Sequence, residues 1–344
     1  MDSFVNGTPK ITVIMPVYNC ELYIQEAVES ILNQSFTDFE FLIIDDASTD
    51  QTVSILKKYC DSRIKLIEKP LNTGYANSLN YGLKIANGEY IARMDGDDIS
   101  YPQRFAKQVS FLDDNPEFVL CGTFYKIIGD DTNFNIPENH NEIKLALLKA
   151  NCIAHPTVLI RKKTLDDFSI IYDVSNETAE DYDMWVRLLQ IGKLYNIQEV
   201  LLKYRIHATS VSRKRAEDQE KIAIRVKLKL LSYLDVKLEK TEQEVLKSCF
   251  KKQVPINFNE IQIFRYIKQK LILSNTDNFF EPIGFLSFLR DFEADILRKC
   301  FLRQKSYSPK VYLEYLNIKY KSNIRLSFIE EFRLLIKAII FWKV

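Results

Sequence analysis

An apolar segment that runs directly into three carboxylates constrains this chain more than any other feature. Residues 89–92 have the composition of a buried β-strand, and Asp95, Asp97 and Asp98 follow closely. Three like charges this close repel one another and favour a shared cation. Hard oxygen ligands at the end of a strand suit Mg²⁺ or Mn²⁺, and such ions usually also hold a substrate diphosphate. Taken alone, the run is equally compatible with a solvated acidic turn.

Strand and helix signals alternate along the front of the chain. The strands are expected at 11–17, 39–44, 63–67 and 90–94, and the helices at 21–33, 48–59, 75–86 and 102–112. This alternation predicts an α/β fold with a doubly wound sheet. In such sheets ligands bind at the carboxyl ends of the strands, which is where Tyr18, Asp46 and the acidic run all fall.

The back of the chain has a different character. Strands are expected at 118–125 and 158–161 and a helix at 180–190, and long lysine-rich helices follow from about residue 214. Residues 213–344 contain 27 Lys and Arg against 16 Asp and Glu, a net charge of +11, which leaves −10 for residues 1–212. An acidic front fits a cation-dependent site, and a basic back fits an anionic partner. Alternatively, the lysines only keep the helices soluble.

Composition and cysteine usage indicate an ordinary globular protein. With 344 residues, the chain can form one large domain or two average ones. Its six cysteines are scattered without a Cys-x-x-Cys pair, which predicts reduced thiols in a cytoplasmic protein. We expect no secretory signal and no transmembrane helix, because the N-terminal residues lack a basic and an apolar region and no apolar run reaches spanning length.

Six segments, in this order, resemble inverting glycosyltransferases of family 2, which have the GT-A fold. They are Pro16–Asn19, Ile44–Asp50, Asn72–Gly74, Asn87–Asp98, Ala179–Trp185 and Tyr204–His207. The match covers roughly residues 9–213, and two stretches, 93–98 and 155–161, are similar to the branch that builds bacterial surface polysaccharides. The resemblance implies a GT-A catalytic domain at 1–213, with nucleotide-sugar binding in about 9–115 and the acceptor part in about 116–213. Residues 214–344 would form a mainly helical, basic C-terminal region.

The resemblance also assigns the residues that bind the donor. Those implied for the nucleotide sugar are Pro16, Tyr18, Asn19, Asp46, Asn72, Arg93, Asp95 and Arg205, and those implied for the metal, Mn²⁺ or Mg²⁺, are Asp95, Asp97, Asp98 and His207. Tyr18 offers a flat face for uracil and Asp46 an acceptor for the uracil N–H. The alternatives are an ordinary strand-end aromatic for Tyr18, a turn residue for Asp46, an ion pair at the core edge for Arg93 and a loop histidine for His207.

Asp181 is the candidate general base, with Glu180 orienting the site or the acceptor. Inversion is a single displacement, so a carboxylate must take the proton of the acceptor hydroxyl on the face opposite the leaving nucleotide. In the family that the chain resembles, the base is the Asp of this Glu-Asp pair. The alternative is that Glu180, Asp181 and Asp183 are only the acidic first turn of a helix. We expect His155 to shape the acceptor pocket.

The expected activity is metal-dependent, inverting transfer of a hexose or N-acetylhexosamine from a UDP-sugar to a lipid-linked oligosaccharide or other surface-glycan acceptor. A polyprenyl-phosphate glycosyltransferase is the alternative enzyme, although the expected lack of transmembrane helices speaks against it. A basic nucleic-acid-binding or scaffold protein is the alternative from another class. It leaves the strand-end carboxylates unexplained, since carboxylates repel phosphate unless a metal intervenes, and we therefore expect no nucleic-acid partner.

The last segment, 324–344, has the pattern of a helix that lies on a membrane. Apolar residues recur along one helical face at Phe328, Phe332, Leu335, Ile336 and Ile339. Residues 339–343 resemble an interfacial anchor, and the positive charge of the region suits an anionic membrane surface. We therefore expect peripheral attachment at the inner face of the cell membrane. The alternative is a core helix packed on the catalytic domain.

Overall fold

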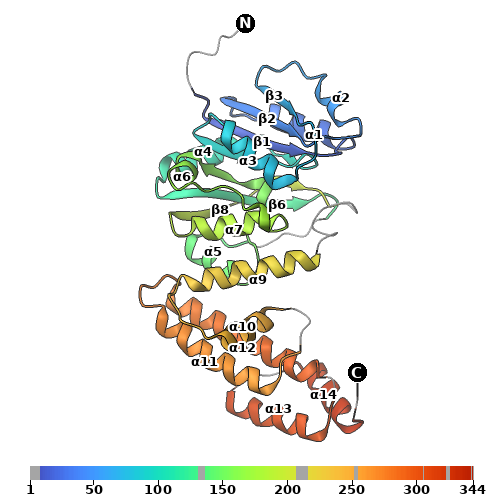
Figure 1. Cartoon of the computed structure of the whole chain (residues 1–344), viewed down its shortest axis with the longest axis vertical. Helices are drawn as coiled ribbons and strands as arrows, with labels where there is room; N and C mark the ends of the chain where they lie inside the picture. The colour runs from blue at the N-terminus through green and yellow to red at the C-terminus, as the bar shows by residue number, and fades with distance from the viewer. Residues whose placement is uncertain are drawn as a thin grey trace. The chain divides into compact units, whose positions relative to one another are not determined.

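The computed structural model describes residues 8–130, 136–206, 216–251, 255–304, 306–322, 326–341 and 343. The chain forms two compact units, one ending at Val226 and the other beginning at Lys227, so that the division falls within helix α9 (Ala216–Ser232) (Figure 1). The division of the first unit into a donor part and an acceptor part stays a prediction.

The first unit is built on one eight-stranded sheet. Its strands are β1 (Ile11–Val17), β2 (Phe39–Asp45), β3 (Ile64–Glu68), β4 (Tyr90–Arg93), β5 (Ile99–Ser100), β6 (Phe118–Ile127), β7 (Leu159–Arg161) and β8 (Lys193–Tyr204), in the order β3-β2-β1-β4-β7-β6-β8-β5. The first four strands are parallel, β7 runs antiparallel to β4 and β6, and β6 and β8 are again parallel. The predicted α/β class is confirmed, and the sheet is mixed.

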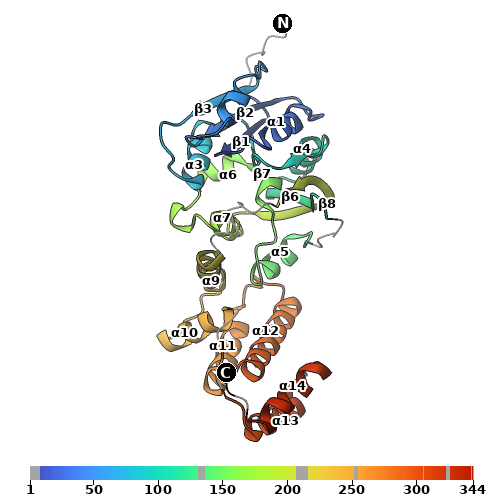
Figure 2. The same ribbon diagram turned by 90° about the vertical axis from the view of Figure 1, so that its right-hand side faces the viewer.

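Helices cover both faces of this sheet. Those of the first unit are α1 (Ile24–Leu32), α2 (Thr52–Leu56), α3 (Tyr75–Ile85), α4 (Arg104–Asp114), α5 (His140–Leu147), α6 (Lys162–Asp167) and α7 (Glu180–Leu188). Figure 2 shows α3 on one side of β1, and α1 and α4 on the other. The apolar side chains of α1 and α4 share a core with Ile11, Val13 and Met15 of β1. On the opposite face α3 lies so close that a side chain at Gly82 would come within 2.7 Å of Ile14.

The register of the parallel strands brings their carboxyl ends to one edge. Val17 of β1 pairs with Asp45 of β2, and Asp45 pairs with Glu68 of β3. Residues that follow these strands, and the acidic run after β4, therefore meet at the same edge, as the strand-end rule for doubly wound sheets predicts.

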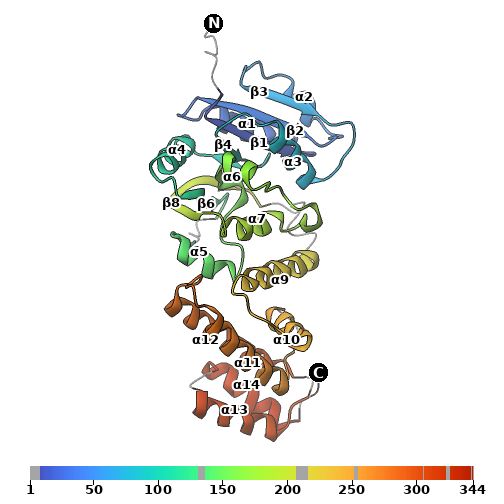
Figure 3. The ribbon, with the colours of Figure 1, turned by 60° about the vertical axis from the view of Figure 1, so that its left-hand side comes forward.

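The second unit is helical, as predicted. Its helices after α9 are α10 (Lys240–Phe250), α11 (Phe258–Ser274), α12 (Pro282–Leu302), α13 (Pro309–Ser322) and α14 (Phe328–Ile339). Figure 3 shows α11 beside α12 and α13 beside α14, and these pairs are in contact. Stacked phenylalanines fill the core, among them Phe280 on Phe285 at 4.6 Å between ring centroids. Within the described residues, no helix combines the length and hydrophobicity needed to cross a membrane.

Candidate active site

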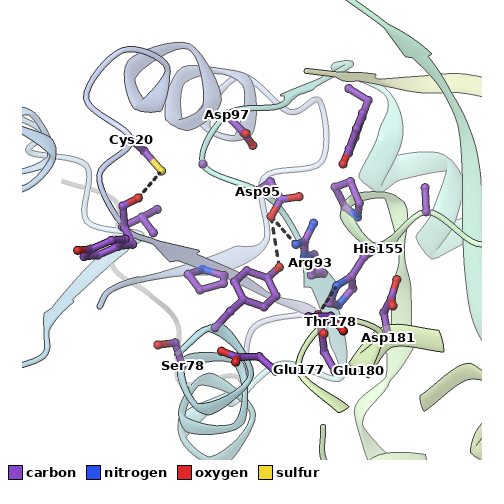
Figure 4. Close-up of a pocket in the computed structure, with 18 of the residues that line it drawn as sticks. Cys20, Ser78, Arg93, Asp95, Asp97, His155, Glu177, Thr178, Glu180 and Asp181 are labelled. Atoms are coloured by element: carbon purple, nitrogen blue, oxygen red, sulfur yellow. Dashed lines mark hydrogen bonds and ion pairs between the residues drawn. The ribbon is translucent and has the colours of Figure 1, made fainter. Parts of the chain in front are cut away.

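A cavity of about 1160 Å³ opens at the carboxyl edge of the parallel strands (Figure 4). One wall comes from the ends of β1, β2 and β4 and from the start of α3. The other comes from residues 151–156 and from residues 177–181, which end in the first turn of α7. The two stretches that the sequence analysis assigned to the donor and to the acceptor therefore face one space.

The residues predicted to hold the nucleotide line this cavity together. They include Pro16, Tyr18, Asn19, Asp46 and Asn72. Tyr18 is 48% exposed and lines the cavity, so part of its side chain is accessible to a ligand. Asn19 adopts left-handed backbone geometry, with φ of 53°, and its side-chain oxygen accepts a hydrogen bond from the amide of Thr49 at 2.8 Å. Asparagine tolerates this geometry, and the bond ties the end of β1 to the loop after β2.

Asp46 is buried, and its carboxylate accepts several hydrogen bonds. Its carboxylate accepts hydrogen bonds from the Lys69 ammonium at 2.5 Å, the Thr73 amide at 3.1 Å and the Gly74 amide at 2.9 Å. Burial would raise the pKa of Asp46, but these hydrogen bonds and the Lys69 charge outweigh it, so the pKa lies below its usual value. Asp46 is therefore a carboxylate that accepts and does not donate. The simple turn residue considered above does not account for this environment.

The acidic run after β4 forms a compact group of oxygens. One carboxylate oxygen from each of Asp95, Asp97 and Asp98 lies within 4.8 Å of the others. Asp98 is fully buried, and one of its oxygens accepts the Arg205 amide at 2.8 Å. Burial, and then the charges of Asp95 and Asp97, raise the pKa of Asp98 well above its usual range.

These three carboxylates fit a divalent cation. The second oxygen of Asp98 is buried and has no hydrogen-bond partner within the described part of the chain. An unsatisfied buried oxygen beside two further hard oxygen donors is the chemistry that Mg²⁺ and Mn²⁺ prefer. A cation would also remove the repulsion that raises the pKa of Asp98. The solvated acidic turn does not explain a carboxylate that is fully buried.

Arg93 occupies the centre of the cavity wall. It is buried, pairs with the carboxylate of Asp95, and lies 5.3 Å from the centre of the Tyr75 ring. Tyr75 in turn donates its hydroxyl to Asp95 at 3.2 Å. The Nε and Nη1 atoms of Arg93 have no hydrogen-bond partner among the residues that the structure describes. Arg93 is thus an ion-pair partner of Asp95 that also carries two buried donor atoms left unsatisfied by the described residues.

Arg205, predicted to bind the nucleotide sugar, braces the acidic loop. Its side chain donates to the carbonyl oxygen of Asp97 at 2.8 Å and to Glu26 at 2.6 Å, and it lies 4.5 Å from the ring centre of Tyr23. It is not among the described residues that line the cavity. His207, predicted as a metal ligand, lies outside the described residues.

Glu180 and Asp181 begin α7 and line the cavity. Asp181 accepts hydrogen bonds from the Asn151 side chain and the Tyr182 amide, both at 2.7 Å. Burial raises the pKa of Asp181, and burial together with the charge of Asp181 raises that of Glu180 well above its usual range. Asp183, in the same turn, instead pairs with Arg187 at 2.8 Å. In this acidic first turn, Glu180 and Asp181 therefore belong to the cavity, whereas Asp183 belongs to a structural ion pair.

His155 packs beside Glu180 in the same cavity wall. Its Nε2 lies 2.8 Å from the Tyr172 hydroxyl, and its Nδ1 lies 3.9 Å from Glu180. Burial lowers the pKa of His155 well below its usual value, so the ring is neutral at physiological pH. The ring also meets Trp185 edge-on at 5.7 Å. As expected from the sequence, His155 lines the cavity on the predicted acceptor side.

Several site residues were not foreseen. Lys69 comes directly after β3, so the strand-end rule would have found it. Asn151 and Tyr172 lie in irregular segments and carry no sequence signal. Glu177 approaches the donor side so closely that a side chain at Gly74 would lie 2.5 Å from its carboxylate.

Figure 4 shows Asp95 and Asp97 on one side of Arg93, and Glu180 and Asp181 on the other. One group of carboxylates can hold a cation, and the other can accept a proton. Between them lies the buried guanidinium of Arg93. Its charge lowers the pKa values of Asp98, Glu180 and Asp181, which burial raises.

Comparison with known proteins identifies the family. The family described as Glycosyl transferase family 2 matches residues 12–174. An uncharacterized glycosyltransferase of Haemophilus influenzae is 35% identical over 243 residues, which cover 67% of this chain and 75% of that protein. An Escherichia coli protein named UDP-Glc:alpha-D-GlcNAc-diphosphoundecaprenol beta-1,3-glucosyltransferase WfaP is 35% identical over 204 residues, 59% of this chain and 79% of that protein.

A solved structure shares the fold. Residues 1–349 of S. aureus TarS, in complex with UDP-GlcNAc, superpose with a TM-score of 0.55 at 19% sequence identity, covering 94% of this chain and 90% of that one. The predicted GT-A fold is thereby confirmed. The chain is a glycosyltransferase and belongs to glycosyl transferase family 2.

Proposed function

We propose that the protein is a metal-dependent, inverting enzyme that transfers a hexose or N-acetylhexosamine from a UDP-sugar to a lipid-linked surface-glycan acceptor. The observation that carries the proposal is that Asp46, the acidic run and the Glu180–Asp181 pair all line one cavity or adjoin it. The name of the E. coli relative, with UDP-Glc as donor and a diphosphoundecaprenol-linked sugar as acceptor, supports both substrate classes. The UDP-GlcNAc in the TarS structure supports the donor.

The donor would lie along the strand ends. The exposed face of Tyr18 stacks on the base, and Asp46 accepts its N–H. Asp95, Asp97 and Asp98 would hold the cation, which when bound offsets the charge that develops on the departing diphosphate. Arg93 lines the same space, and its positive charge lies beside Asp95. Each contact thus stabilises either the bound nucleotide or the charge that appears on it during the reaction.

Asp181 is the better base of the acidic pair. It accepts two hydrogen bonds, which favour its ionised form, whereas burial and the charge of Asp181 raise the pKa of Glu180 and favour its protonated form. Ionised Asp181 takes the proton of the acceptor hydroxyl. The hydroxyl oxygen then bonds to the anomeric carbon as the bond to the diphosphate oxygen breaks, and UDP leaves with the electron pair. Asn151 holds the carboxylate in the orientation that this transfer needs.

Helix α14 offers a surface for the lipid side of the acceptor. Its exposed apolar side chains are Phe328, Ile329, Phe332, Ile336 and Ile339, and the exposed Ile340 follows directly. Its opposite side is buried through Leu334 and Ala338. Within the second unit, α14 contacts α12 and α13.

The charges around α14 suit an anionic lipid surface. The two acidic residues of its first turn are neutralised, Glu330 by Arg298 and Glu331 by Lys319, both at 2.7 Å. Arg333 and Lys343 are exposed. Each large apolar side chain contributes about 1.5–3 kcal/mol on burial and each nearby cation about 1 kcal/mol at an anionic surface, which is enough for reversible attachment. Trp342, part of the predicted anchor, lies outside the described residues.

A panel of UDP-sugars incubated with Mn²⁺, read as UDP released, tests the activity. We expect release from one or a few donors, its loss on adding EDTA and its return with excess Mn²⁺. Asp97→Asn should lower the rate by at least about 100-fold, since a lost metal ligand costs on the order of several kcal/mol. Asp166→Asn, which alters an exposed ion pair on α6, is the control. Equal UDP affinity and release with and without EDTA would refute the metal requirement.

Asp181→Asn should lower the transfer rate at least about 100-fold, because a positioned general base contributes about 10²–10⁴-fold. UDP affinity measured by calorimetry should stay within about twofold, since the substituted group contacts the acceptor and keeps its size. A rate loss below tenfold would place the base elsewhere.

The pH dependence of transfer should report the raised pKa of the acidic pair. Because the base acts only when ionised, activity should fall as pH decreases through that pKa, at a higher pH than for an ordinary Asp, whose pKa is about 3.9. Asn151→Ala removes a hydrogen bond that favours the ionised form, so the acid limb of kcat should move to still higher pH. An acid limb that stays in place or moves to lower pH would contradict this arrangement.

Full-length protein should sediment with vesicles containing anionic lipids, and the triple variant Phe328→Ser, Phe332→Ser, Ile336→Ser should not. UDP binding should be unchanged in that variant. Leu273→Ser, at an exposed apolar residue of α11, is the control and should sediment normally. If the protein never sediments with vesicles, or if it forms a dimer that the triple variant dissociates, the face binds something other than a membrane.

A further inference from the structure

Lys69 is a partly buried cation beside the pocket proposed for the nucleobase. Its side chain is 14% exposed, and its amide donates to the carbonyl oxygen of Asp45 at 2.9 Å, which fixes it at the end of β3. The ammonium donates to Asp46 at 2.5 Å, to the hydroxyl of Ser78 at 3.0 Å and to the hydroxyl of Thr73. An ammonium has three donors, and these three partners use them all. Lys69 therefore acts on its neighbours and has no donor left for a ligand.

Its main effect is to limit what Asp46 can bind. A carboxylate has about four acceptor positions. Oδ1 of Asp46 receives the Lys69 ammonium and the Thr73 amide, whereas Oδ2 receives the Gly74 amide. One acceptor position at Oδ2 remains, and Asp46 lines the cavity near Tyr18. The three donors also fix the plane of the carboxylate, so the direction of that last position is set before a ligand arrives.

We propose that Lys69 is a positioning residue that determines base specificity, by holding Asp46 as a charged acceptor that accommodates uracil and discriminates against cytosine. Uracil and cytosine have the same size, so the shape of the pocket separates them poorly. At ring position N3, uracil carries a hydrogen that can be donated, whereas cytosine presents a lone pair. A lone pair facing a fixed carboxylate is repelled and leaves both groups unsatisfied. Cytosine can offer its amino group only by shifting its ring. The inference rests on the proposed UDP-sugar function.

Without the Lys69 charge, only the hydrogen bonds from the Thr73 and Gly74 amides would oppose the effect of burial on the pKa of Asp46. Burial favours the neutral carboxyl, which carries a proton that it can donate to the N3 of cytosine. A neutral side chain at position 69 should therefore weaken discrimination, and more so at low pH. In the natural protein the hydrogen bonds and the charge of Lys69 keep the pKa of Asp46 low, so discrimination should persist over the same pH range.

Binding of UDP and CDP, measured by calorimetry with Mn²⁺ at pH 7.5 and 5.5, tests the proposal. Both ligands share ribose, diphosphate and metal, so the ratio of their dissociation constants isolates the base. The natural protein should bind UDP at least about tenfold more tightly than CDP at both pH values. Lys69→Met should reduce this ratio at least about fivefold, mainly through tighter CDP binding at pH 5.5. Lys69→Arg, which keeps the charge, should retain most of the preference.

Lys65→Met is the matched control, because Lys65 lies on the same strand but pairs with Glu40 at the surface. Lys69→Gln serves as a second neutral variant if thermal unfolding shows that Lys69→Met is misfolded. Equal losses of UDP and CDP affinity in the neutral variants would show that Lys69 is only structural and would overturn the proposal. Failure of the natural protein to bind UDP would instead reject the proposed donor class.

Discussion

The site depends on the attraction between the buried guanidinium of Arg93 and the carboxylates around it. Carboxylates removed from water are driven towards their neutral forms, and the cavity wall holds them in two groups. The charge of Arg93 opposes that tendency in Asp98, Glu180 and Asp181, and the side chain pairs directly with Asp95. The positive charge of Arg93 therefore allows the two groups of carboxylates to lie in the wall of one cavity although several of them are buried.

A second arginine, Arg104, connects Arg93 with the cavity wall formed by residues 151–156. Arg104 of α4 is fully buried, and its guanidinium donates to the carbonyl oxygen of Arg93 at 3.0 Å and to that of Pro156 at 2.8 Å. Burial, and then the nearby charge of Arg93, lowers its pKa to about 9. Because Arg104 contacts both the end of β4 and the turn that carries His155, it couples the donor side to the acceptor side. The relative position of the two walls is therefore set by hydrogen bonds to backbone atoms.

Local pattern was sufficient to predict the parallel half of the sheet and the residues at its edge. β1, β2 and β4 are mainly apolar and almost entirely buried, and a doubly wound sheet places whatever follows them at a common edge. The site pair on α7 was predicted through the resemblance to a family. The long strand β8 was missed, because bulges in its pairing with β6 interrupt the period-two pattern that marks a strand. Non-local contacts were also out of reach: Arg205 faces Glu26, a partner 179 residues away, and no local rule predicts that choice.

The order of the site residues along the chain separates the two halves of the reaction. Among the described residues, the hydrogen bonds of Asp46 are made with residues 17–74, and the acidic run ends at Asp98. The proposed base and its hydrogen-bond partners instead lie between Asn151 and Tyr182. A recombination point between residues 98 and 151 would leave the hydrogen bonds of Asp46 and of Asp181 intact, but it would separate Arg205 from Glu26, Asp97 and Asp98. A replaced stretch would therefore have to preserve two contacts with the part of the chain that is kept: the Pro156 carbonyl that accepts from Arg104, and the Arg205 groups that donate to Asp97 and Asp98.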